Sequence, residues 1–189
     1  MSAAVRLGAF VALALATGAT GLVACSSPDA GARVDAGGPD RAQFATVLPV
    51  LGRRCGSLEC HGSPYRNMRL YGFGGLRLPG KAGGDAGFIA TPDPQGPEIP
   101  LDTEVTASYE AVVGLEPEIM RQVVAAKGAG SDRLTFVRKG RGDEDHKGLK
   151  RYCRGDSADV CIQSWLAGGV DADACGRALG VGPGVCAPP

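Results

Sequence analysis

Apolar residues recur at helical spacing in several stretches of the chain, and the first of these follows a long polar segment. Phe44, Val47, Leu48 and Leu51 fall on one face of a predicted helix. Pro49 lies inside this run and predicts a kink or a break into two turns, because proline cannot donate the backbone hydrogen bond. The pattern indicates that a globular domain begins near this point.

Later stretches have the same periodicity. We expect helices that begin at Asp102, near Pro117 and at Asp156, with a short helix capped by Ser131 between the last two. Trp165 lies on the apolar face of the final helix and is expected in the core. Since no sustained strand-type alternation accompanies these helices, the sequence predicts a mainly α fold.

Long irregular segments separate and follow these helices. Residues 72–100 are rich in glycine and proline, and residues 138–150 form a charged polar loop. We expect the helical domain to cover residues 42–170. The cysteine-containing tail, residues 171–189, is expected to be irregular.

The start of the chain has the composition of an export signal. Arg6 precedes an apolar run over residues 7–15, and small residues follow up to a Leu-Val-Ala-Cys sequence that ends at Cys25. That sequence resembles the lipobox of bacterial lipoproteins. The resemblance implies that residues 1–24 are removed. Residues 25–41 lack apolar periodicity, so we expect them to form a flexible tether.

The same resemblance implies acylation of Cys25, with a chain such as palmitate, and attachment of the protein to a membrane of the cell envelope. Ser26, in place of Asp, resembles the sorting pattern of outer-membrane lipoproteins and favours the outer over the inner membrane. The alternative is an ordinary signal peptide with an incidental cysteine.

Composition narrows the function classes. The chain has 20 Lys and Arg against 20 Asp and Glu, so nothing in its charge suggests nucleic acid as a partner. Aromatic residues make up only 5% of the chain, which weakens the case for a large self-sufficient core. We therefore expect disulfides or a bulky cofactor to help hold the fold.

Four cysteines near the C-terminus are expected to form two disulfides in an oxidising compartment. The local pairings join Cys153 to Cys161 and Cys175 to Cys186, but four cysteines allow three connectivities and the sequence does not choose among them.

The sharpest motif is Cys55-Gly-Ser-Leu-Glu-Cys60-His61. In c-type haem attachment two thiols form thioether bonds to the porphyrin, and the histidine after the second cysteine binds the iron. The departure is the spacing, with four residues between the cysteines in place of two.

This motif belongs to a wider pattern that resembles the planctomycete-type cytochrome c domains of planctomycetes and myxobacteria. The matching stretches are Phe44-x-x-Val47-Leu48-Pro49-x-Leu51-x-x-x-Cys55, Cys60-His61-Gly62, Gly74-Gly75-Leu76-Arg77-Leu78 and Ile162-Gln-Ser-Trp165-Leu166-Ala-Gly168. The resemblance covers roughly residues 42–170. It implies an all-α cytochrome c-like fold, one haem c on Cys55 and Cys60, and His61 as proximal iron ligand.

The distal ligand departs from the family pattern, because no Met-Pro pair precedes the final helix. His146 lies in about that region and is the first choice for the sixth ligand. Met120 and Met68 are the thioether alternatives, and a five-coordinate or haem-free site stays open. A histidine ligand favours a lower potential than a methionine ligand.

These features predict an electron carrier with a redox protein as partner. No catalytic triad, paired catalytic carboxylates or phosphate-binding glycine loop is evident, so we do not expect an enzyme. The alternatives for Cys55 and Cys60 are a disulfide or, less favoured, a zinc site with His61. A haem-free, disulfide-stapled binding module is the second functional hypothesis, and an oxidoreductase with an open distal position is the third.

Overall fold

The structure is a computed structural model that describes residues 37–72, 74–78 and 100–186. The predicted signal, Cys25, most of the tether and most of the glycine- and proline-rich loop lie outside these ranges. Within them no helix has both the length and the apolar character needed to span a bilayer.

The described part of the chain is built from helices, which confirms the prediction of a mainly α fold. The elements are α2 (Arg41–Cys55), α3 (Asp102–Val113), α4 (Pro117–Ala125), the 3₁₀ helix η1 (Ser131–Arg133), α5 (Thr135–Arg141), α6 (Ser157–Leu166) and α7 (Ala172–Leu179). Extended pairing in the described ranges is limited to an isolated bridge between Tyr71 and Leu76.

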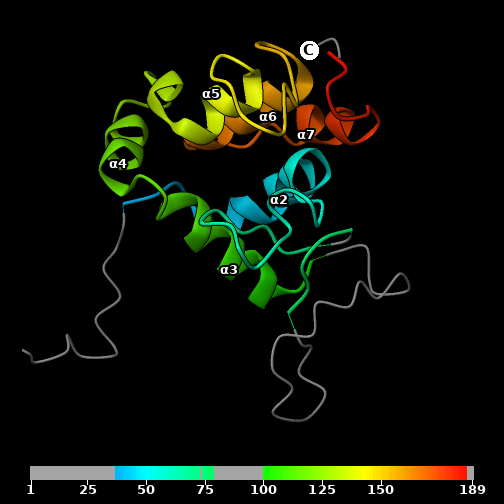
Figure 1. Cartoon of the computed structure of the whole chain (residues 1–189). Coiled ribbons are helices and arrows are strands. Elements are labelled where there is room, and N and C mark those ends of the chain that lie inside the picture. The colour runs from blue at the N-terminus through cyan, green and yellow to red at the C-terminus, as the bar shows by residue number, and fades with distance from the viewer. Residues whose placement is uncertain (1–36, 73, 79–99, 187–189) are drawn as a thin grey trace, which may run out of the picture. The chain divides into compact units, whose positions relative to one another are not determined.

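Helix α2 lies at the centre of this arrangement, between α3 on one side and α6 with α7 on the other (Figure 1). Asp40 caps it, since its side chain accepts a hydrogen bond from the Ala42 amide. The expected break at Pro49 does not occur, and the helix is one segment. Its apolar face, including Phe44 and Leu48, is fully buried, and this packing offsets the hydrogen bond that proline cannot make.

An aromatic cluster joins three of the helices. The Phe44 ring of α2 lies 4.9 Å from that of Trp165 in α6 and 5.6 Å from that of Tyr109 in α3. The Trp165 side chain is buried, and its Nε1 donates to the Asp40 carbonyl oxygen. Trp165 is therefore a core residue, as expected.

Two of the four predicted helix starts are confirmed, and the other two are shifted by one residue. Asp156 caps α6 by accepting from the Asp159 amide, and Pro117 is the first residue of α4. Asp102 is the first residue of α3 and not its cap, which is Leu101. The short helix predicted with Ser131 as its cap is divided into η1 and α5. Ser131 is the first residue of η1, whose cap is Gly130.

The prediction of an irregular tail was wrong, because α7 is a helix. Asp171 caps it through the Ala174 amide, and Ala174, Cys175 and Ala178 are its buried face. These small residues let α7 pack closely against α6 and α2. The sequence carried this spacing, but small residues make a weak apolar signal.

The two expected disulfides are present, and neither is a local pairing. Cys161 of α6 is bonded to Cys175 of α7, and Cys153 is bonded to Cys186. The physical reason is that α7 folds back along α6, which brings Cys161 and Cys175 to a Cα–Cα distance of 4.8 Å. The chain after α7 then returns to Cys153.

A buried ion pair fixes α5 to α6. The Arg141 guanidinium donates to both carboxylate oxygens of Asp159, at 2.8 and 3.0 Å, and both side chains are about 5% exposed. Asp159 also accepts from the Gly155 amide. The contact holds the start of the 142–150 loop relative to α6.

Candidate functional site

The Cys-x4-Cys-His motif is a compact turn at the end of α2. Cys55 is the last residue of the helix, and its carbonyl oxygen accepts a hydrogen bond of 2.9 Å from the His61 amide. The amides of Cys60 and Gly62 both donate to the Ser57 carbonyl oxygen. The turn therefore brings the second cysteine and the histidine back beside the first cysteine.

Two glycines make this turn sterically feasible. A Cβ atom on Gly62 or on Gly75 would overlap the carbonyl oxygen of Gly56. Three backbone segments thus meet where no side chain fits. This accounts for glycine directly after His61 and in the Gly-Gly pair of the next loop.

His61 is oriented through one ring nitrogen. Its Nδ1 lies 2.9 Å from the Met68 carbonyl oxygen, and the Leu70 amide donates to the His61 carbonyl oxygen. Burial lowers the pKa of His61, opposed by the hydrogen bond to Met68, so the ring is neutral at pH 7. A neutral ring that donates from Nδ1 to a carbonyl leaves Nε2 free to bind a metal.

The second histidine comes from the 142–150 loop on the other wall. The Leu149 amide donates to the His146 carbonyl oxygen, and Leu149 has a positive φ of 55°, so the loop turns sharply here. Burial lowers the pKa of His146, and the nearby positive charge of Lys139 lowers it further. His146 is therefore a second neutral imidazole.

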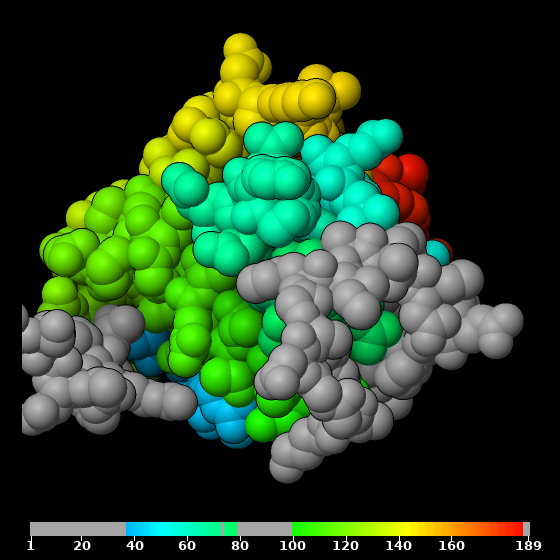
Figure 2. All heavy atoms as spheres, turned by 60° about the horizontal axis from the view of Figure 1, so that its bottom comes forward, coloured from blue at the N-terminus to red at the C-terminus, as the bar shows by residue number. Residues whose placement is uncertain are grey.

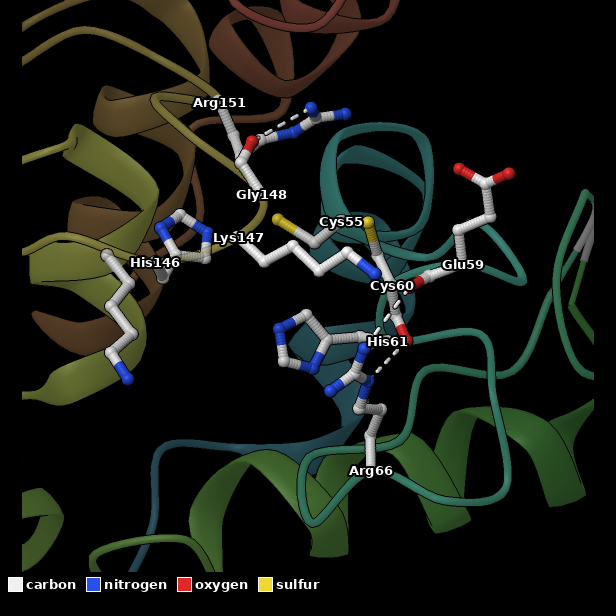
Figure 3. Close-up of a pocket in the computed structure, with 10 residues that line it drawn as sticks. Cys55, Glu59, Cys60, His61, Arg66, His146, Lys147, Gly148 and Arg151 are labelled. Atoms are coloured by element: carbon white, nitrogen blue, oxygen red, sulfur yellow. Dashed lines mark hydrogen bonds between the residues drawn. The ribbon is translucent and has the colours of Figure 1, made fainter.

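A pocket lies between these walls, and Figure 3 shows both imidazole rings approaching it from their separate loops. In Figure 2 the segment after α2, in cyan-green, lies next to the 142–150 loop, in yellow, on one face of the molecule. The cavity volume is about 180 Å³. Its lining residues are Cys55, Glu59, Cys60, His61, Arg66, Lys139, His146, Lys147, Gly148 and Arg151.

The two motif cysteines are free thiols and are not bonded to each other. Burial raises the pKa of the Cys55 thiol to about 12, although Arg151 opposes the shift. Such a thiol is protonated at neutral pH and is a weak nucleophile.

Of the three candidate distal ligands, one lines the pocket and two lie in the core. His146 lines the pocket with His61, whereas the Met68 and Met120 side chains are buried in the hydrophobic core and do not line it. Met68 contributes instead through its backbone carbonyl, which orients His61. Only the tertiary arrangement reveals that role, because no sequence signal marks a carbonyl acceptor.

Sequence reasoning did not identify the charges around the pocket. Arg66, Lys139, Lys147 and Arg151 line it together with a single acidic side chain, Glu59. Arg66 follows the cysteine motif, and the other three lie in or next to the charged segment 138–150, whose acidic residues hid its cationic side in the sequence. The pocket wall is therefore strongly cationic although the whole chain is neutral.

Among the described residues, no three His, Cys, Asp or Glu side chains gather closely enough to hold a metal ion. No protein-family model, curated protein or solved structure matches this chain.

Proposed function

We propose that this chain is a c-type cytochrome-like electron carrier with one covalently attached haem. The observation that carries the proposal is the meeting of Cys55, Cys60, His61 and His146 around one pocket. The two free thiols on one wall would hold the haem through thioether bonds, and the neutral imidazoles on the two walls would bind its iron. When bound, the haem would supply an iron that gains and loses single electrons.

In this proposal His61 is the proximal ligand, because it adjoins Cys60 and its Nδ1 is already occupied by the Met68 carbonyl. His146 is the distal ligand, because it reaches the same pocket from the facing loop. The cavity is smaller than the roughly 300–1,000 Å³ of pockets that enclose a ligand, so a bound macrocycle would extend beyond it.

The central experiment is expression of the mature chain in an exporting host with a cytochrome c maturation system. We expect a red protein whose mass exceeds that of the polypeptide by one haem. Cys55→Ser and Cys60→Ser should each remove one thioether bond and reduce haem incorporation. Ser57→Ala is the matched control, since this exposed side chain lies between the two cysteines.

A colourless product with all six cysteines after Cys25 oxidised would contradict the proposal. It would leave the second candidate, a haem-free binding module on a disulfide-stapled helical scaffold. The small cavity volume is the observation that favours this candidate.

The distal ligand has its own test. His146→Ala should change the reduced visible spectrum and admit carbon monoxide to the iron. Met68→Leu and Met120→Leu are matched controls and should leave both unchanged, because their side chains lie in the core. Unchanged spectra in His146→Ala, with a change in either methionine variant, would reassign the ligand.

We further propose that the domain is tethered to the outer membrane through an acylated Cys25 and exchanges electrons with a redox protein. The support is the signal-like composition and the lipobox-like sequence before Cys25. Labelling with a palmitate analogue should mark the wild-type chain and not Cys25→Ser. Recovery of the labelled chain in the inner-membrane fraction would correct the membrane assignment.

A further inference from the structure

A buried arginine stands directly before the first motif cysteine. Arg54 is 1% exposed, although it lies at the end of a helix. Its guanidinium donates to three backbone carbonyl oxygens, those of Ala178, Gly182 and Arg151. Two of these acceptors belong to the end of α7 and the turn after it, where unpaired carbonyls and the helix dipole favour a cation.

The Arg151 side chain in turn binds the backbone of Arg54. Its Nε donates to the Arg54 carbonyl oxygen, so each arginine side chain binds the backbone of the other. Its Nη1 donates to the Gly148 carbonyl oxygen at 3.2 Å. Arg151 therefore connects the end of α2 with the loop that carries His146.

The hydrogen bond from Arg151 Nε to the Arg54 carbonyl oxygen joins the two walls of the pocket, and the bond to Gly148 ties the same side chain to its own loop. The Arg54 backbone belongs to the wall that carries Cys55, and Gly148 belongs to the opposite wall, two residues after His146. Figure 3 shows Arg151 extending from the loop wall beside Gly148. Two further contacts hold the segment around Arg151 in place. The Gly184 amide donates to the Arg151 carbonyl oxygen, and a disulfide joins Cys153 to Cys186.

We propose that Arg54 and Arg151 form a reciprocal clamp that sets the spacing of the two pocket walls and thereby holds His146 in reach of the iron. This inference rests on the proposed haem function. Both arginines are positioning residues, since they act on the ligand through the backbone.

The clamp requires a side chain that can donate from two nitrogens at once, as a guanidinium does. Arg151 binds the Arg54 and Gly148 carbonyls with two different nitrogens, whereas a lysine has one nitrogen and cannot reproduce this planar geometry. Arg151→Lys therefore preserves the charge at the pocket and removes the bridge. Arg54→Lys tests the buried partner, but it risks unfolding because one ammonium would replace the two nitrogens that bind the Ala178 and Gly182 carbonyl oxygens.

The experiment compares Arg151→Lys with Arg53→Lys, at an exposed arginine of α2 next to Arg54. In the haem-loaded protein we expect Arg151→Lys to show a five-coordinate fraction in the reduced spectrum and faster carbon monoxide binding. In the haem-free chain, backbone amides of residues 146–151 should exchange with deuterium about 10- to 100-fold faster, the factor for one lost hydrogen bond to a charged group. Arg53→Lys should match the wild type in every measurement.

The two hypotheses fail differently. A wild-type chain that binds no haem overturns the proposed function, and the functional part of the clamp with it, while exchange in the haem-free chain still tests the structural bridge. A haem-loaded Arg151→Lys with unchanged spectrum and carbon monoxide binding overturns the clamp alone. Faster exchange without any change in carbon monoxide binding also overturns it, because the bridge would then not govern the ligand.

Discussion

Burial keeps both pocket histidines neutral, and this has a consequence for stability in acid. The pKa values of His61 and His146 lie below the ordinary value of 6.5, with burial as the largest cause in each case. In the unfolded chain the rings regain ordinary pKa values. The unfolded state therefore binds more protons than the folded state as the pH falls below about 6.5.

We predict that the haem-free protein loses stability as the pH falls from about 6.5 through the lowered pKa values of the two histidines. The contribution is complete above the unfolded pKa, and stability rises with pH across this window. Urea unfolding at a series of pH values measures it. The variant with both His61→Asn and His146→Asn should show a shallower dependence in this range, and an equal slope would refute the prediction.

Glycine at residue 62 has a steric role that a single methyl group tests. Gly62→Ala should lower the free energy of unfolding by about 1–3 kcal/mol, because the added Cβ would overlap the Gly56 carbonyl oxygen. Gly52→Ala is the matched control, because no atom beyond its own stretch of α2 backbone lies within 4 Å of its Cβ position. It should raise stability by about 0.5–1 kcal/mol through helix propensity. Equal effects of the two substitutions would contradict the steric argument.

At the scale of elements, α5 and α6 are joined by a charge pair that is almost fully removed from water. The side chains of Arg141 and Asp159 are 5% and 4% exposed. Arg154 and Asp143 form a comparable pair at the surface, with 63% and 40% exposure. Solvent screens the second pair but not the first.

We therefore predict that Arg141→Met costs about 3–5 kcal/mol, because it leaves the Asp159 carboxylate buried without its cation. Arg154→Met should cost no more than about 1 kcal/mol. Denaturant unfolding of the two variants checks this contrast. Similar losses in both would show that burial of the first pair does not govern its contribution.

At the scale of the whole molecule, the two disulfides connect the C-terminal segment to the rest of the helical domain. The bond between Cys153 and Cys186 closes 33 residues, and that between Cys161 and Cys175 closes 14. A longer closed loop restricts the unfolded chain more strongly.

Replacing either bonded pair by serines should cost about 3–4 kcal/mol, with the 33-residue pair the more costly by about 0.8 kcal/mol in the chain-entropy treatment. Thermal and urea unfolding of the two double variants measure the order. A larger loss for the 14-residue pair would mean that native packing between α6 and α7 outweighs the loop entropy.

The sequence by itself determined the local features. Asp156 and Pro117 mark helix starts because capping and a missing amide are properties of the chain at that point. The apolar face of α2 followed from spacing alone, as did the buried Trp165. The Cys-x4-Cys-His motif was also visible as a candidate site.

Only the tertiary structure decided the long-range features. The disulfide connectivity depends on α7 folding back along α6, and the spacing of four cysteines does not encode that path. The sequence favoured His146 over Met68 and Met120 as distal ligand because of its position in the chain. That His146 lines the pocket depends on how the 142–150 loop packs. The bridge between Arg54 and Arg151 joins residues 97 apart through backbone carbonyls. Such acceptors exist at every residue, so only the packed chain selects which of them are used.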